Sequence, residues 1–85
     1  MRDFKIKVTP KESEVIQKLL FLAGYSWRNT NNINVKDTDK PFLYFDEGIL
    51  TWSNLESTFY SDMYDNPEIT FEEFVNEIEL ELNNK

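Results

Sequence analysis

Residues 42–53 read FLYFDEGILTWS, and this stretch decides the fold. Two runs of aromatic and aliphatic residues flank the polar group Asp46-Glu47-Gly48, a pattern that predicts a β-hairpin. We expect a three-residue loop in which Gly48 takes the positive-φ position. Counting outward from that loop pairs Phe45 with Ile49, Tyr44 with Leu50, Leu43 with Thr51 and Phe42 with Trp52. Both faces of the hairpin are apolar in this register.

Upstream, residues 4–8 alternate apolar and charged side chains, as a strand with one buried face does. Thr9, Pro10 and Glu12 then indicate a helix start, because Thr9 can cap, Pro10 suits the first position and Glu12 completes a capping box. We expect this helix over residues 10–23, with Phe21 pointing away from its core stripe. The predicted stripe consists of Val15, Ile16, Leu19, Leu22 and Ala23.

Between this helix and the hairpin, residues 25–28 have the composition of a strand and residues 29–32 that of a turn. Residues 33–36 are expected to form a further short strand and residues 37–41 another turn. This segment therefore leads the chain back to the sheet.

Downstream of the hairpin, residues 54–65 have no clear period, although Leu55, Phe59 and Tyr60 fit one helical turn over the sheet. Thr70 and Glu73 form a second capping box, so a second long helix begins at Phe71. Its predicted core stripe consists of Phe71, Phe74, Val75, Ile78 and Leu82.

These elements predict one α+β domain over residues 1–85, since 85 residues leave no room for a second core. We expect a small, mainly antiparallel sheet of about four strands in the order β-α-β-β-β-α. Both long helices pack on one face of this sheet. The sequence does not determine what covers the other face.

The composition excludes most enzyme chemistry. The chain has no Cys and no His, which excludes thiol nucleophiles, imidazole bases and Cys/His zinc sites. Its two glycines form no phosphate-binding loop, and Asp37-Thr38-Asp39 lacks the later Gly and Glu of a calcium loop. We therefore expect a non-enzymatic protein without catalytic residues, metal or cofactor.

Charge is divided unevenly along the chain, which has a net charge of −7. Residues 1–40 hold eight Lys or Arg against five Asp or Glu, whereas residues 41–85 hold one Lys against eleven acids. Such a surface disfavours duplex DNA and anionic membranes and attracts basic proteins. No apolar stretch approaches the ~18 residues that cross a bilayer, so we expect a cytoplasmic protein.

The second long helix supplies the first candidate site, a partner-binding face. Its carboxylates lie within a turn of one another without a compensating cation, and a leucine opposite the core stripe lies among them. A solvated helix face explains the same pattern. The exposed leucine also fits packing against Phe21, or a homodimer seam. The predicted partner-binding residues are Glu72, Glu73, Glu77, Leu80 and Glu81.

An aromatic sheet face is the alternative candidate, because exposed aromatic rings beside cations stack the bases of nucleotides or single-stranded RNA. The same rings fit a core beneath residues 54–65 equally well. The residues of this alternative site are Trp27, Arg28, Tyr44 and Trp52.

Four stretches resemble small acidic accessory proteins of tailed bacteriophages: VIQKLLFLAGYSW at 15–27, KPFLY at 40–44, ILTW at 49–52 and EITFEEF at 68–74. These residues are structural, so the resemblance carries no functional residue with it. It implies a protein that binds and inhibits a host protein, such as a defence component, a toxin or a nucleic-acid-binding factor, in the host bacterial cytoplasm. With the charge pattern, it predicts an inhibitor that docks its acidic C-terminal half on a basic host surface. An antitoxin or immunity protein is a further alternative.

Overall fold

The computed structural model describes residues 1–28, 32–61 and 66–84. Most of the turn predicted at 29–32 and the end of the segment predicted at 54–65 lie outside the described residues. The elements, in chain order, are β1 (Phe4–Lys7), α1 (Pro10–Leu22), β2 (Ser26–Trp27), β3 (Phe42–Asp46), β4 (Ile49–Ser53), α2 (Glu56–Phe59) and α3 (Phe71–Asn83).

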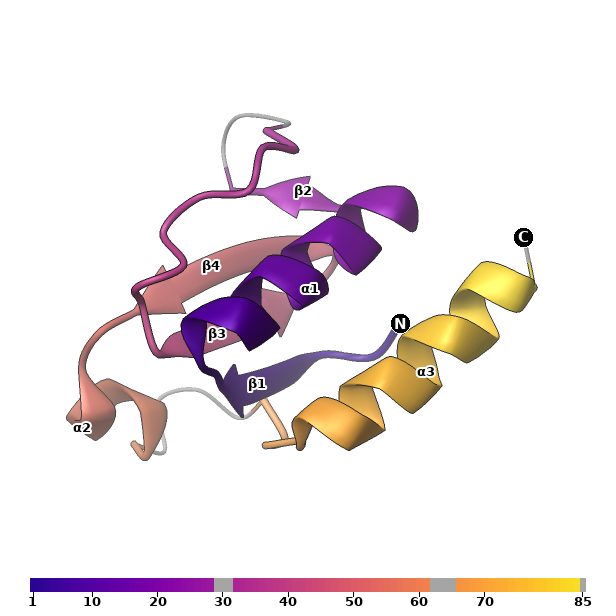
Figure 1. The fold of residues 1–85 in the computed structure, drawn as a ribbon. Helices are drawn as coiled ribbons and strands as arrows, with labels where there is room; N and C mark the ends of the chain where they lie inside the picture. The colour runs from indigo at the N-terminus through magenta and orange to yellow at the C-terminus, as the bar shows by residue number, and fades with distance from the viewer. Residues whose placement is uncertain (29–31, 62–65, 85) are drawn as a thin grey trace.

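The four strands form one sheet in the order β1-β3-β4-β2. β1 pairs with β3 and β3 with β4 in antiparallel fashion, while β2 runs parallel to β4. α1 carries the chain from the β1 edge to the β2 edge, and the β3–β4 hairpin fills the space between them (Figure 1). The predicted α+β class, with a mainly antiparallel sheet, is confirmed.

The sheet separates two hydrophobic layers of unequal size. α1 and α3 both lie over one face (Figure 1), where Phe4, Phe45 and Phe74 are fully buried in the main core. The other face, whose covering the sequence did not determine, is partly covered by α2. There Phe59 stacks on Phe42 with their ring centroids 4.6 Å apart. The sheet is therefore sandwiched at one end and open at the other.

Both predicted capping boxes are confirmed. The Glu12 amide donates to Thr9 Oγ1 at 3.2 Å and the Glu73 amide donates to Thr70 Oγ1 at 3.1 Å. In each box the glutamate side chain accepts in return from the amide of the capping residue. Local hydrogen bonding thus fixes where α1 and α3 begin.

The predicted hairpin register is wrong by one residue. Phe45 pairs with Leu50 and Asp46 with Ile49, because the turn contains two residues and not three. Glu47 and Gly48 both take positive φ, at 50° and 83°, as a tight turn of the primed type requires. A one-residue shift exchanges the faces of β4, so Leu50 enters the main core and Thr51 points the other way.

The predicted core stripe of α1 is also wrong in part. Leu22 is 72% exposed, whereas the polar residues Ser13 and Gln17 are fully buried. The side-chain Nε2 of Gln17 donates to the backbone carbonyl of Lys36 at 2.8 Å. The side-chain Oε1 of Gln17 accepts from the backbone N–H of Lys36 at 2.9 Å. These two bonds compensate for the burial of a polar side chain, so the buried side of α1 need not coincide with its purely apolar stripe.

No strand forms at residues 33–36, in contrast to the prediction. This part of the chain is held by side chains instead: Gln17 binds Lys36, and the Trp27 indole N–H donates to the Asn34 carbonyl at 3.1 Å. Asn34 itself donates its amide to the side chain of Asn32. The segment thus follows the sheet without joining a ladder.

Irregular chain runs along both outer strands of the sheet. At β1, the Lys5 amide donates to the Pro67 carbonyl and the Ile69 amide donates to the Lys5 carbonyl. At β2, the Trp27 amide donates to the Asn32 carbonyl at 2.9 Å.

Candidate functional site

The predicted partner-binding residues divide into two groups on α3. Glu72, Glu73 and Leu80 are exposed, Leu80 to 66%, and Glu79 joins them on the side of the helix turned away from the core. We call these four residues the outer face of α3. Helical periodicity explains the arrangement, because Phe74 and Ile78 turn the opposite side of α3 into the core.

Glu77 and Glu81 instead hold the N-terminal segment against α3. Arg2 donates to Glu77 from Nε and Nη2, at 2.8 and 2.9 Å. This hydrogen bond lowers the pKa of the Glu77 carboxyl below its ordinary value, against a smaller opposing effect of burial. Glu81 contacts the Met1 ammonium group and accepts from the Tyr25 hydroxyl at 2.7 Å. Burial and this bond to Glu81 raise the pKa of Tyr25 to about 12.

Phe21 and Leu80 also differ in their surroundings. Phe21 is half-buried and packs against the main core, so its predicted departure from the α1 stripe does not leave it in solvent. Leu80 stays exposed.

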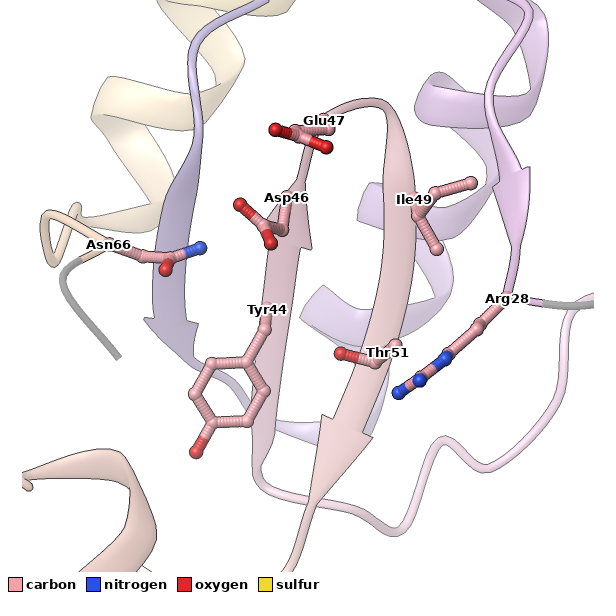
Figure 2. A pocket seen from close by; sticks show the side chains of 7 residues that line it. All are labelled: Arg28, Tyr44, Asp46, Glu47, Ile49, Thr51 and Asn66. Atoms are coloured by element: carbon pink, nitrogen blue, oxygen red, sulfur yellow. The ribbon is translucent and has the colours of Figure 1, made fainter. Parts of the chain in front are cut away.

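A hollow of about 430 Å³ lies on the open part of the sheet's second face (Figure 2). Alternate residues of β3 and β4 form its floor, because strand side chains point to opposite faces in turn. Arg28 reaches over it from the end of β2, and Asn66, whose amide donates to the Phe45 carbonyl at 3.0 Å, closes the other side. The residues that line it are Arg28, Tyr44, Asp46, Glu47, Ile49, Thr51 and Asn66.

The charges of this hollow are mixed. Asp46 and Glu47 lie at its turn end, while Arg28 lies across β4 from them (Figure 2). A hydrogen bond with Asp3 raises the pKa of the Asp46 carboxyl above its ordinary value, with desolvation and the charges of Asp3 and Glu47 acting in the same direction. Two neighbouring carboxylates make the turn end unfavourable for an anion.

The structure does not assemble the predicted aromatic sheet face. Tyr44 lies on the second face, 3% exposed, beside Phe59. Trp27 belongs to the main core on the opposite face, and Trp52 follows Leu50 by two residues and so shares that face as well. The shifted hairpin register is the reason, because it reverses the expected orientation of β4.

Three of the four residues predicted for the alternative site nevertheless meet at the β2–β4 edge. Trp27, Arg28 and Trp52 line a second hollow, of about 180 Å³, which we call the indole hollow. Its other lining residues are Lys36, Leu50 and Thr51.

Lys36 and Lys40 are the residues of this region that sequence reasoning missed. The Lys36 ammonium lies 5.3 Å from the Trp27 ring centroid, and the Lys40 ammonium lies 4.6 Å from that of Trp52. No local pattern connects them with the indoles, because the side chain of Gln17, far away in sequence, brings Lys36 to the sheet.

Across residues 1–28, 32–61 and 66–84, no group of three or more His, Cys, Asp or Glu side chains is arranged to hold a metal ion. Among the helices of those same ranges, none has the length and apolar character that crossing a bilayer requires.

No protein-family model, curated protein or solved structure matches this chain. Its function has therefore to be inferred from its own geometry and charge.

Proposed function

We propose that this chain is a non-enzymatic binding protein that docks the outer face of α3 on a basic surface of another protein. The observation that carries the proposal is the composition of α3: residues 71–83 hold five Glu and no Lys or Arg. Glu72, Glu73 and Glu79 are exposed on the same helix as Leu80, which is 66% exposed.

This arrangement supplies both parts of a protein interface. An exposed apolar side chain can fill a pocket of the partner, and the carboxylates along the helix can steer a basic partner into register. Glu77 and Glu81 belong to the predicted binding set and add to the negative potential of the helix. Because both already contact the N-terminal segment, we assign them a supporting role.

A second copy of the chain fits this face poorly. In a two-fold dimer the same patch meets itself, so carboxylates would oppose carboxylates. We therefore favour a partner of opposite charge over a homodimer. In the setting that the resemblance to phage accessory proteins implies, this partner is a basic host protein, and covering its nucleic-acid-binding or active surface inhibits it.

Affinity capture from a bacterial lysate, followed by titration of the purified partner, tests the proposal. We expect Leu80→Ala to weaken binding about tenfold, as the loss of a buried anchor does. Glu72→Gln combined with Glu79→Gln should lower the association rate and flatten its dependence on salt. Glu56→Gln with Glu68→Gln removes the same charge from exposed positions elsewhere and is the matched control.

The proposal is contradicted if a protein that combines Leu80→Ala, Glu72→Gln and Glu79→Gln binds every captured partner with the same affinity as the wild type. Equal weakening by the control pair contradicts it too, because net charge alone would then explain binding. A captured toxin would specify the antitoxin form of the same proposal.

A further inference from the structure

The indole hollow lies apart from the outer face of α3 and has the opposite charge. α3 lies beside β1 at one edge of the sheet, whereas β2, which contributes Trp27 to the hollow, is the strand at the opposite edge (Figure 1). Three cations surround it: Arg28 and Lys36 in its lining, and Lys40 over the Trp52 ring. In a chain of net charge −7, this grouping is a local reversal of sign.

The anions nearest in the chain only partly balance these cations. Asp39 lies 3.5 Å from the Lys40 ammonium, and its side chain is 77% exposed. Asp37 takes a positive φ at the start of the same turn. The Arg28 and Lys36 side chains have no ion pair within the described residues. Within these residues, neither side chain is therefore neutralised by a direct ion pair, although Arg28 also reaches over the larger hollow that holds Asp46 and Glu47.

The two indoles differ in what they can offer a ligand. Trp27 is 3% exposed and donates its indole N–H to the Asn34 carbonyl, so it forms a fixed wall. Trp52 is 39% exposed, and the Lys40 ammonium lies over its ring, so a stacking base has to displace this lysine. Trp52 is thus the indole of this hollow that a ligand can reach.

We propose that the indole hollow binds a nucleotide, either free or within a single strand, with its base on Trp52 and its phosphate among Arg28, Lys36 and Lys40. A planar base on an exposed indole accounts for the aromatic component, and a phosphate accounts for the cations. An acidic peptide would use the cations but not the indole. The proposal does not depend on the outer face of α3.

The two indole N–H signals in ¹⁵N–¹H spectra of the full chain report on binding directly. The probes are uridine monophosphate, an eight-residue oligouridylate, inorganic triphosphate and a glutamate-rich peptide. We expect the Trp52 signal to shift with the nucleotide, the oligonucleotide or both, and to respond much less to triphosphate or the peptide. Response to the monophosphate identifies a free-nucleotide site, and response to the oligonucleotide alone identifies a single-strand site.

Substitutions separate stacking from charge. Trp52→Ala should weaken binding about tenfold, which corresponds to the loss of one stacked base. Trp52→Phe keeps a ring and should lose less. With the oligonucleotide, Arg28→Gln and Lys36→Gln should each reduce the slope of log affinity against log salt by about 0.7. Lys11→Gln and Lys18→Gln, exposed cations on α1, are the matched controls.

The proposal is overturned if neither nucleotide probe moves the Trp52 signal at millimolar concentration. It is also overturned if triphosphate or the peptide binds as tightly as the nucleotides, or if the α1 controls weaken binding as much as Arg28→Gln. Leu80→Ala should leave nucleotide binding unchanged, which distinguishes failure here from failure of the α3 interface.

Discussion

Gln17→Met is the substitution that tests most directly how the irregular segment is held. Methionine keeps the length and approximate volume of the fully buried glutamine, so no large cavity forms. It removes the side-chain amide group, whose Nε2 donates to the backbone carbonyl of Lys36 at 2.8 Å and whose Oε1 accepts from the backbone N–H of Lys36 at 2.9 Å. It also removes the bond from Gln17 to Ser13 Oγ, at 3.0 Å.

The expected loss follows from the two bonds to the Lys36 backbone. Each contributes about 0.5–1.5 kcal/mol net, so together they contribute about 1–3 kcal/mol. Lys36 is exposed, and water can take over part of the bonding, which keeps the loss near the middle of that range. Burial of the more apolar methionine offsets some of it. We expect a loss of about 2 kcal/mol, or a melting temperature about 8–16 °C lower.

Urea denaturation measures this loss from the shift in midpoint, provided that the slope is unchanged. Lys18→Met, an exposed neighbour on α1, is the control and should change stability by at most about 0.5 kcal/mol. Hydrogen exchange should speed up at the Lys36 amide in the Gln17 variant. A Gln17→Met protein as stable as the wild type, with the Lys36 amide still protected, would refute the assigned role of this side chain.

Three further predictions concern single sites. Glu47→Asn should stabilise the protein by about 0.5–1 kcal/mol in thermal unfolding, because asparagine tolerates the left-handed backbone better; a lower melting temperature contradicts the turn assignment. Folding raises the pKa of Asp46 above 3.8, so the contribution of this carboxyl to stability should fall as the pH rises above 3.8, and Asp46→Asn should remove that contribution from melting curves recorded against pH. The raised pKa of Tyr25, about 12 against 10.0, means that stability should fall as the pH rises between those values. Glu81→Gln should bring the phenolate absorbance of Tyr25 to lower pH, and an unchanged titration would exclude the assigned hydrogen bond.

What the sequence predicts well in this chain depends on neighbours along it. Thr70 and Glu73 lie three residues apart, and their mutual hydrogen bonds fix the start of α3 without reference to the rest of the fold. The α+β class likewise follows from local alternation and periodicity.

The errors have distant causes. Three-residue and two-residue turns both suit Asp46-Glu47-Gly48, and the structure places the Asp3 carboxylate where it accepts from the Glu47 amide at 2.9 Å in the shorter one. Gln17 looks like a surface residue until Lys36 meets it across the fold. Because the indole hollow depends on both of these long-range contacts, it could not be predicted from any short segment of the sequence.

The covered edges of the sheet restrict how this molecule can associate. Along the described stretches of β1 and β2, the main-chain bonds to Pro67, Ile69 and Asn32 occupy positions where an incoming strand would otherwise add. Strand addition at these positions is therefore disfavoured, and concentrated solutions should resist the strand-by-strand growth that leads to fibrils.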